Sequence, residues 1–399
     1  MKIGTAGTER LLQGNLFSLG PRVASLPKAQ ISIAYGAWGR PFDNETLIAM
    51  MGAEGDRSLI EATLITQRHY IYPFPVRAEG DPLFPPEEVE RELTIGAALI
   101  RLALAANGWQ DADLLIVTSS LPPCDDFPQR LAERAGLASR PTKRYYLACN
   151  GAVAALLDIL QDASLREARV VIASVEGLSV SSDGTDMAAL AIFGNGAAAI
   201  AFRPRQITLL AGQTAIVPDT MGVIRVPRTY DLPPPAERRA PPPWYTLAPG
   251  AEEMFAFGDD GVVTTLPVSR KVYHSEMEGL TTARFFARVV PPVVQELLES
   301  YRRVQAKVPE RLFGLFHQPS GGVLALVNRG LEKISAKLGL PRMDVPWVMD
   351  QVGMGNVSSA TTPIALAHLM QAGQLPRGEP FNITGFGVGA SITSMMVQI

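Results

Sequence analysis

The sequence contains little cysteine, little histidine and no strong excess of charge. Only two cysteines and four histidines occur in 399 residues. So few cysteines exclude a disulfide-stapled scaffold and fit a reducing compartment, so we expect the protein in the cytoplasm. The formal net charge of −3 gives no reason to expect nucleic acid or a membrane surface as a partner.

Long apolar runs are also missing. No apolar stretch long enough to span a bilayer is free of polar residues. The N-terminal residues lack the continuous apolar region of a signal peptide. We therefore expect a soluble protein without a membrane segment, and we expect no bound metal or cofactor.

The composition that is present, 47% hydrophobic and 19% charged residues, is typical of a globular protein too long for one core. Prolines fix φ and lack a donor, so the proline-rich middle of the chain is expected outside the central sheets. It is either a surface excursion or a cap over a substrate entrance. We expect an N-terminal extension, a first half, a proline-rich insertion and a second half, at residues 1–28, 29–204, 205–267 and 268–399.

Strand and helix patterns recur in the same order in the two halves, and a weak internal duplication of βαβ type accounts for this. Helices are also expected before the first pass, at 44–51, 57–66 and 87–106, after a strand at 30–35. The first pass comprises strand 114–119, helix 127–137, a helix from Cys149 to about 162, and strands 169–174 and 197–202. The second comprises strand 312–316, helix 321–338, a helix from about 355 to 371, and strands 381–384 and 390–397. In this scheme Cys149 and Asn356 occupy equivalent positions at helix starts.

Cys149 lies between an apolar strand and an Ala/Leu-rich helix. A helix N-terminus lowers the pKa of a thiol and so favours a reactive thiolate. The same position also suits a buried structural cysteine. Cys124, on a loop after strand 114–119, is expected to be structural or incidental.

His317 directly follows the apolar strand 312–316, and ligands bind at strand ends in α/β sheets. Taken alone, His317 could be a polar residue at a sheet edge and Asn356 a helix N-cap. Together with Cys149 they suggest a nucleophile that accepts an acyl group from a thioester, flanked by two neutral donors. These donors would stabilise the enolate formed when a second substrate loses CO2.

Five segments resemble, in order, the signature of the thiolase-fold condensing enzymes: Ala-Cys-Asn-Gly-Ala, Phe-Gly-Asn-Gly-Ala-Ala-Ala, His-Gln-Pro-Ser, Gly-Asn-Val-Ser-Ser-Ala and Gly-Phe-Gly-Val-Gly. β-Ketoacyl synthase III is the nearest branch, followed by chalcone-synthase-like type III polyketide synthases. The resemblance covers roughly 30–204 and 268–399. It implies a five-layered αβαβα fold made of two duplicated halves related by a pseudo-two-fold axis, and a homodimer.

The same resemblance implies the site. Cys149, His317 and Asn356 would form a Cys-His-Asn triad, and the backbone N–H groups of Cys149 and Val388 would bind the oxyanion. Substrate contacts are expected at Arg68, where the family contacts the coenzyme A nucleotide, and at Phe386 and Gly387.

Departures from the family pattern affect the expected partners. After His317 no arginine occurs until Arg329, which argues against the usual docking of acyl carrier protein, and Asn195 replaces an aspartate in a turn that we expect to be structural. We expect decarboxylative condensation of an acyl thioester, carried by coenzyme A or acyl carrier protein, with a malonyl thioester. The alternatives are a type III polyketide synthase, an acyltransferase with a non-carbon acceptor, and a non-catalytic partner subunit.

Overall fold

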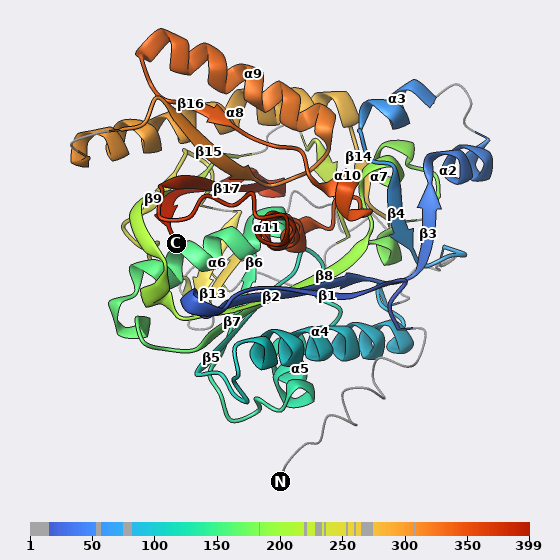
Figure 1. The fold of residues 1–399 in the computed structure, drawn as a ribbon. Coiled ribbons are helices and arrows are strands. Elements are labelled where there is room, and N and C mark those ends of the chain that lie inside the picture. The colour runs from blue at the N-terminus through green and yellow to red at the C-terminus, as the bar shows by residue number, and fades with distance from the viewer. Residues whose placement is uncertain are drawn as a thin grey trace.

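Two large mixed β-sheets and three layers of helices form the body of the structure, a computed structural model, and two small two-stranded sheets are added to them (Figure 1). It describes the backbone of residues 16–52, 57–74, 82–182, 184–218, 222–227, 234, 237–252, 254–258, 261–264, 274–305 and 308–399. Helices α4 and α5 lie outside the first sheet, α6 and α11 lie between the sheets, and α8 and α9 lie outside the second sheet. This arrangement confirms the expected αβαβα fold.

The elements up to residue 202 begin with an antiparallel pair and continue with alternating strands and helices. They are β1 (Leu19–Leu26), β2 (Ile31–Ala37), β3 (Arg40–Asp43), α2 (Asn44–Met51), α3 (Arg57–Ala62), β4 (Gln67–Tyr70), α4 (Pro86–Ala106), β5 (Leu114–Thr118), α5 (Phe127–Ala135), β6 (Thr142–Tyr146), α6 (Gly151–Gln161), β7 (Val170–Gly177), α7 (Met187–Ile192) and β8 (Asn195–Phe202).

The later elements are β9 (Thr208–Ile216), β10 (Ile224–Arg225), β11 (Tyr245–Leu247), β12 (Phe255–Gly258), β13 (Gly261–Thr264), β14 (Glu276–Met277), α8 (Gly279–Val304), β15 (Arg311–Phe316), α9 (Gly321–Leu338), β16 (Arg342–Asp344), α10 (Met349–Val352), α11 (Thr361–Gln371), β17 (Phe381–Gly387) and β18 (Ser391–Gln398). The predicted helices 44–51, 87–106, 127–137 and 321–338 are confirmed to within two residues.

The two large sheets repeat one strand order, which confirms the internal duplication. The eight-stranded sheet has the order β1-β2-β8-β7-β5-β6-β13-β12, and the six-stranded sheet has the order β11-β9-β18-β17-β15-β16. Five consecutive strands of the first sheet, β2-β8-β7-β5-β6, therefore correspond to β9-β18-β17-β15-β16. The pairings also agree in direction, with antiparallel pairs at the first two steps and parallel pairs at the last two.

Two expectations about the ends of the halves are wrong. Residues 208–216, placed in the proline-rich insertion, form β9, which pairs antiparallel with β18 inside the second sheet. Residues 19–26, placed in the extension, form β1, which pairs with β2. β9 is held by a strand that is distant in sequence, whereas β1 pairs with the next strand along the chain. The exact boundaries of the two halves stay predictions.

The helices between the sheets are mostly apolar because sheets cover both of their faces. Ten consecutive residues at the start of α11 and its preceding turn, 358–367, are buried, as are the first seven residues of α6. Strands β7 and β8 are buried along their whole length, as expected for strands covered on both faces. The first turns of α6 and α11 are thus shielded from solvent.

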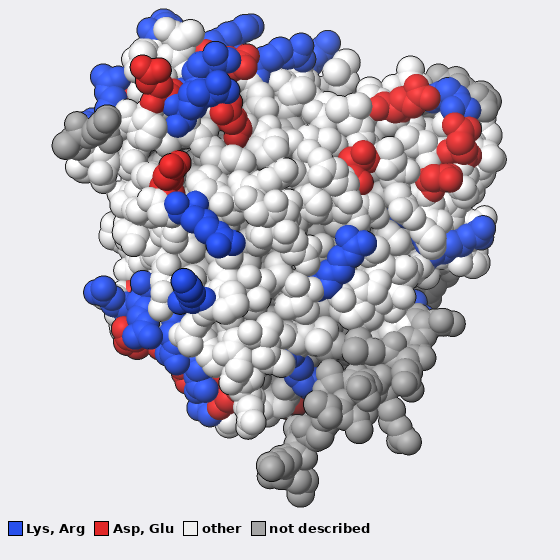
Figure 2. Space-filling view, viewed as in Figure 1, with Lys and Arg blue, Asp and Glu red and all other residues white. Residues whose placement is uncertain are grey.

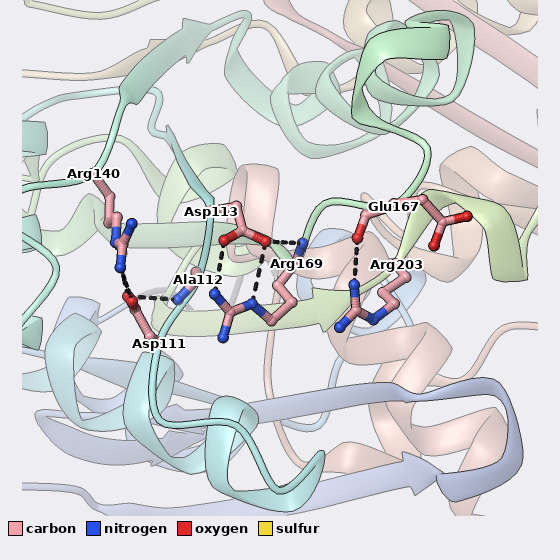
Figure 3. A network of polar contacts seen from close by, with 7 residues as sticks. All are labelled: Asp111, Ala112, Asp113, Arg140, Glu167, Arg169 and Arg203. Atoms are coloured by element: carbon pink, nitrogen blue, oxygen red, sulfur yellow. Dashed lines mark hydrogen bonds and ion pairs between the residues drawn. The ribbon is translucent and has the colours of Figure 1, made fainter.

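Ion pairs fasten the amino ends of the parallel strands β5, β6 and β7 (Figure 3). Asp113, before β5, accepts hydrogen bonds from the Arg169 guanidinium at 2.7 and 3.2 Å and from its backbone N–H at 2.8 Å. Asp111 pairs with Arg140, which precedes β6. Because these ion pairs lie at the amino ends of the strands, they do not occupy the carboxyl ends of the same strands, where ligands bind in α/β sheets.

On the surface, charges of both signs are interspersed. Figure 2 shows Lys and Arg side chains beside Asp and Glu side chains, around a broad area of uncharged residues. Among the described residues, no helix combines the length and the apolarity needed to cross a bilayer.

The segment before β11 is anchored to α6 by one carboxylate. Asp158 accepts hydrogen bonds from Trp244 Nε1 at 2.6 Å and from the Tyr245 hydroxyl at 3.2 Å. Burial raises the pKa of Asp158 to about 6, and these hydrogen bonds oppose the rise. The segment around Trp244 and Tyr245 is therefore fixed against helix α6.

We predict that Trp244→Phe lowers the free energy of unfolding by about 2 kcal/mol, because it keeps the ring but removes a donor to a partly buried carboxylate. Denaturant titration measures the change. Trp347→Phe is the matched control, because it removes a solvent-exposed hydrogen bond to the Leu64 carbonyl. An equal loss in both variants would contradict the anchoring role of Asp158.

Candidate active site

Polar side chains gather at the carboxyl ends of the parallel strands of both sheets, where the duplication places them face to face. Cys149 follows β6, Glu176 lies at the end of β7, and His317 follows β15. Strand ends of this kind are the usual ligand sites of α/β sheets. The structure thus brings together residues that are 168 positions apart in sequence (317 − 149).

Cys149 lies on a strained turn between β6 and α6. A short 3₁₀ helix, η3 (Ala148–Asn150), precedes α6, and Ala148 has φ 45°, a left-handed conformation that costs energy for a residue with a side chain. The second half repeats the turn as η8 (Ser358–Ala360), with Ser358 at φ 47°. The expected equivalence of Cys149 and Asn356 is therefore wrong, because Ser359 occupies the position that corresponds to Cys149.

The Cys149 thiol is buried, with 6% of the residue exposed. The Ser358 hydroxyl donates a hydrogen bond to Sγ at 3.3 Å, and the Asn356 side chain also interacts with the thiol. Burial nevertheless raises the pKa of Cys149 to about 12, and the nearby Glu176 charge raises it further. The local hydrogen-bond donors lower this pKa, and desolvation outweighs them.

His317 is buried at the end of β15, with 1% of the residue exposed. Its backbone N–H donates to the Thr384 carbonyl at 2.7 Å, and its ring meets the Phe386 ring edge-on at a centroid distance of 5.2 Å. Burial lowers the pKa of His317 to about 3, so the imidazole is neutral at physiological pH. Its Nδ1 has no hydrogen-bond partner among the described residues. A neutral imidazole can donate one proton to a substrate oxygen.

Asn356 is oriented by its own turn. Its Oδ1 accepts hydrogen bonds from the Ser358 N–H at 2.8 Å and from the Thr361 hydroxyl at 3.1 Å. The amide oxygen is thus occupied within η8 and α11. The amide NH2 group is therefore the part of Asn356 that remains to act as a donor.

Two narrow pockets meet at Cys149. The first, called the His317 pocket, also contains Asn356, and the second, called the Ser358 pocket, is rich in hydroxyl groups. Each has about 30 Å³ of room, enough for about two water molecules. The His317 pocket is lined by Cys149, Ile192, Phe193, Ile224, Met277, Gly279, Thr282, Phe286, His317, Pro319, Val323, Asn356, Phe386, Gly387 and Val388. The Ser358 pocket is lined by Ser120, Ala148, Cys149, Leu178, Ser181, Ser182, Phe193, Ile224, Val226, Ser275, Ser358 and Val388.

Gly387 lets the end of β17 approach Cys149 closely. A Cβ atom at Gly387 would lie 2.8 Å from the Cys149 backbone nitrogen. Val388, the next residue, begins the 3₁₀ helix η9 (Val388–Ala390) and lines both pockets. The N–H groups of Cys149 and Val388 lie in the first turns of 3₁₀ helices, where the helix itself supplies no acceptor. Phe386 and Gly387, expected as substrate contacts, both line the His317 pocket.

Two other residues singled out in the sequence lie outside both pockets. The Arg68 guanidinium is buried and donates to Asn44 Oδ1 and to the carbonyls of Ile65 and Ala191. This arrangement gives Arg68 a structural role, and its expected contact with a substrate phosphate is not supported by the described residues. Cys124 contacts Arg130 instead, at 3.6 Å from Nη1 to Sγ, consistent with an incidental role.

Several residues at or near the site were not found from the sequence. Ser358 and Ser359 stand inside a motif that was quoted only for Asn356. Glu176 is fully buried at the end of an apolar strand. A lone acidic residue in Val-Val-Ile-Ala-Ser-Val-Glu is the signal that could have revealed it, because an unpaired carboxylate is costly to bury. Among the described residues, no group of three or more His, Cys, Asp or Glu could hold a metal ion.

We predict that Gly387→Ala slows covalent modification of Cys149 by about 10²-fold, because the added methyl group displaces the Cys149 backbone and misaligned groups react slowly. The measurement is the rate of modification followed by mass spectrometry. Gly20→Ala is the control, since nothing lies within 4 Å of its Cβ position. Equal rates for Gly387→Ala and the wild type would contradict the close approach.

The buried His317 predicts acid sensitivity. Its folded-state pKa lies below the ordinary value of 6.5, so the unfolded chain binds the proton first and stability falls as the pH drops below 6.5. Between pH 6.5 and pH 5 this loss amounts to about 2 kcal/mol. In His317→Asn this loss is absent, so its unfolding free energy should change less over the same range. Parallel pH profiles of the two proteins would refute the burial of a neutral imidazole.

Comparisons with known proteins show relatives of similar sequence and fold. The sequence profile described as 3-oxoacyl-[acyl-carrier-protein (ACP)] synthase III C terminal matches residues 324–399, which include Asn356. A β-ketoacyl-[acyl-carrier-protein] synthase III of Synechococcus sp. (strain WH7803) is 26% identical over 306 residues, covering 75% of this chain and 79% of its relative. The protein of the same name from Pseudomonas aeruginosa (strain LESB58) is 26% identical over 309 residues, covering 74% and 78%.

Solved structures show the same fold. 3-Oxoacyl-(acyl carrier protein) synthase III from Pseudomonas aeruginosa PAO1 has a TM-score of 0.63 and 21% identity, covering 92% of this chain and 96% of its own. The priming β-ketosynthase of the R1128 polyketide pathway has a TM-score of 0.62 and 19% identity, covering 91% and 93%. The chain has the thiolase-like fold of these condensing enzymes and is similar in sequence to β-ketoacyl-[acyl-carrier-protein] synthase III.

Proposed function

We propose that Cys149 is the nucleophile that carries an acyl group, and that His317 and Asn356 assist the decarboxylation of a malonyl thioester. The observation that carries this proposal is that all three side chains line one pocket. A thiol nucleophile and two neutral donors are what a condensation through an acyl-enzyme requires.

The first half-reaction is acyl transfer between sulfurs. Cys149 Sγ attacks the carbonyl carbon of an acyl thioester, and the carrier thiol leaves as the new thioester forms. The backbone N–H groups of Cys149 and Val388 are the proposed donors to the oxyanion, since both residues line the pocket at the ends of short helices. Fixed backbone donors in a dry site stabilise such charge strongly.

The second half-reaction is the loss of CO2 from the malonyl thioester. His317 is neutral and the oxygen of Asn356 is already occupied, so both groups are suited to donate hydrogen bonds to the thioester carbonyl. Negative charge collects on that oxygen as the enolate forms. The enolate carbon then attacks the acyl-cysteine, which gives a 3-ketoacyl thioester and releases Cys149.

The substrate class that we propose is an acyl group delivered by coenzyme A or by acyl carrier protein. The names of the relatives point to the carrier protein. We also propose a homodimer, which the resemblance to thiolase-fold condensing enzymes implies, and a cytoplasmic location, which the low cysteine content implies. The apolar side chains that line the His317 pocket, including Ile192, Phe286 and Val323, suit an acyl chain rather than a charged group.

Replacing each of the three residues separates the two half-reactions. Cys149→Ala should form no acyl-enzyme at all. His317→Ala and Asn356→Ala should still be acylated but should lose condensation by at least about 10²-fold, because each removes a donor to the enolate oxygen. Intact-protein mass spectrometry measures acylation, and release of labelled CO2 from malonyl-CoA measures decarboxylation.

Cys124→Ser serves as the control and should behave as the wild type in both assays. The proposal is contradicted if the wild-type protein gains no mass with any short- or medium-chain acyl group, whether it is carried by coenzyme A or by acyl carrier protein. An acyl-enzyme without CO2 release would instead indicate transfer to a non-carbon acceptor.

A further inference from the structure

A chain of hydroxyl groups links Cys149 to a buried carboxyl group. The Ser358 hydroxyl donates to Cys149 Sγ at 3.3 Å, and it is hydrogen-bonded to the Ser120 hydroxyl. The Ser120 hydroxyl in turn donates to Glu176 Oε1 at 3.3 Å. All four residues are buried, so the chain is shielded from solvent.

The surroundings of Glu176 are built to accept a negative charge. Its oxygens accept hydrogen bonds from the Ser120 N–H at 3.0 and 3.1 Å and from the Ser359 N–H at 3.1 Å. The Ser359 hydroxyl adds a further hydrogen bond at 2.5 Å. Several donors directed at one carboxyl group favour its ionised form.

Other features favour the protonated form, so the carboxyl group can exist in either state. Burial raises the pKa of Glu176 to about 7. The titratable groups facing it are Glu92, from α4, and Cys149, from the start of α6. Glu92 is fully buried and neither of its oxygens has a hydrogen-bond partner among the described residues, so it is neutral.

Cys149 needs a group that can take its proton, and His317 is poorly suited to that task. Burial lowers the pKa of the imidazole to about 3, so it holds a proton weakly. The hydrogen bond at Sγ leads to Ser358 and from there toward Glu176. Efficient general bases have a pKa near the working pH, a condition that Glu176 meets and His317 does not.

We propose that Glu176 is the general base of the acylation step and receives the Cys149 proton through the hydroxyls of Ser358 and Ser120. The inference rests on the proposed role of Cys149 as the acyl carrier. Glu176 does not touch the substrate, and it acts on the nucleophile through the two hydroxyl groups.

The proton transfer balances over one catalytic cycle. For the transfer, the Ser358 hydroxyl turns from Sγ toward Ser120, so that its oxygen can accept the thiol proton. As Sγ bonds to the acyl carbon, its proton passes to Ser358, the Ser358 proton passes to Ser120, and the Ser120 proton passes to Glu176. The carrier leaves as a thiolate and takes a proton from water. When the enolate displaces the acyl group, Cys149 leaves as a thiolate and regains its proton from Glu176 along the same path.

Alkylation of Cys149 by iodoacetamide tests the proposal without any thioester. The measurement uses the full chain with Cys124→Ser, so that the remaining thiol is Cys149, and follows the rate from pH 5.5 to pH 9 by mass spectrometry. We expect the rate to rise through an inflection near pH 7, where Glu176 ionises. In Glu176→Gln the inflection should vanish and the rate at pH 7.5 should fall by about 10²-fold.

The competing explanation predicts the opposite sign. If Glu176 were only a buried negative charge, its removal would lower the pKa of Cys149 and accelerate alkylation. A faster or unchanged rate in Glu176→Gln therefore overturns the proposal. Ser358→Ala breaks the first link of the relay and should also lose the inflection, which keeps the test decisive if Glu176→Gln does not fold.

Glu92→Gln is the matched control. It removes a neighbouring carboxyl group that is already neutral, so the inflection should remain. Acylation by acyl-CoA, measured on the same variants, tests the proposed function separately from the proton relay. A wild-type protein that shows the inflection but is never acylated would refute the proposed function and leave the relay intact, whereas acylation without the inflection would refute the relay.

Discussion

The contact between the two strained turns at the internal two-fold is the constraint on which the rest of the structure depends. The Ser358 hydroxyl reaches Cys149 Sγ, and the Thr118 hydroxyl donates to Ser359 Oγ at 2.9 Å. These bonds exist only because α6 and α11 start side by side between the sheets. A Cβ at Gly151 would lie 3.0 Å from the Tyr145 carbonyl oxygen, so the turn tolerates no larger residue there without a shift. The duplication therefore places the two turns in close contact, and close packing leaves the residues of the site little room to move.

Burial at that contact sets the protonation of every group in the site. Desolvation raises the pKa of Cys149 and lowers that of His317, so both are neutral, although a thiolate–imidazolium pair would be the simplest way to activate a cysteine. The site instead offers hydrogen bonds: from Ser358 to the thiol and from backbone N–H groups to Glu176. A neutral His317 is the form that donates to an enolate oxygen, so the desolvation that hinders formation of a thiolate suits the decarboxylation that we propose.

The sequence predicted the parts of the fold and site that depend on local pattern. Cys149 and His317 follow apolar strands whose ends could be recognised, and Asn356 stands in a distinctive motif. β9 was missed because its partner β18 lies far away in sequence and prolines follow it closely. The register of the second turn was also missed: the equivalence of Cys149 with Ser359 depends on where the left-handed residues fall, which residue types alone do not show.

Glu176 was not identified for a related reason. The role of a buried carboxyl group depends on the hydrogen-bond donors around it, and these donors come from loops in both halves.

The burial of Cys149 also affects how easily its thiol is oxidised. A thiol that is protonated, buried and bordered by pockets of about 30 Å³ is a poor target for peroxides, because oxidation to sulfenic acid proceeds through an accessible thiolate. We therefore expect Cys149 to resist oxidation by peroxides in the folded protein.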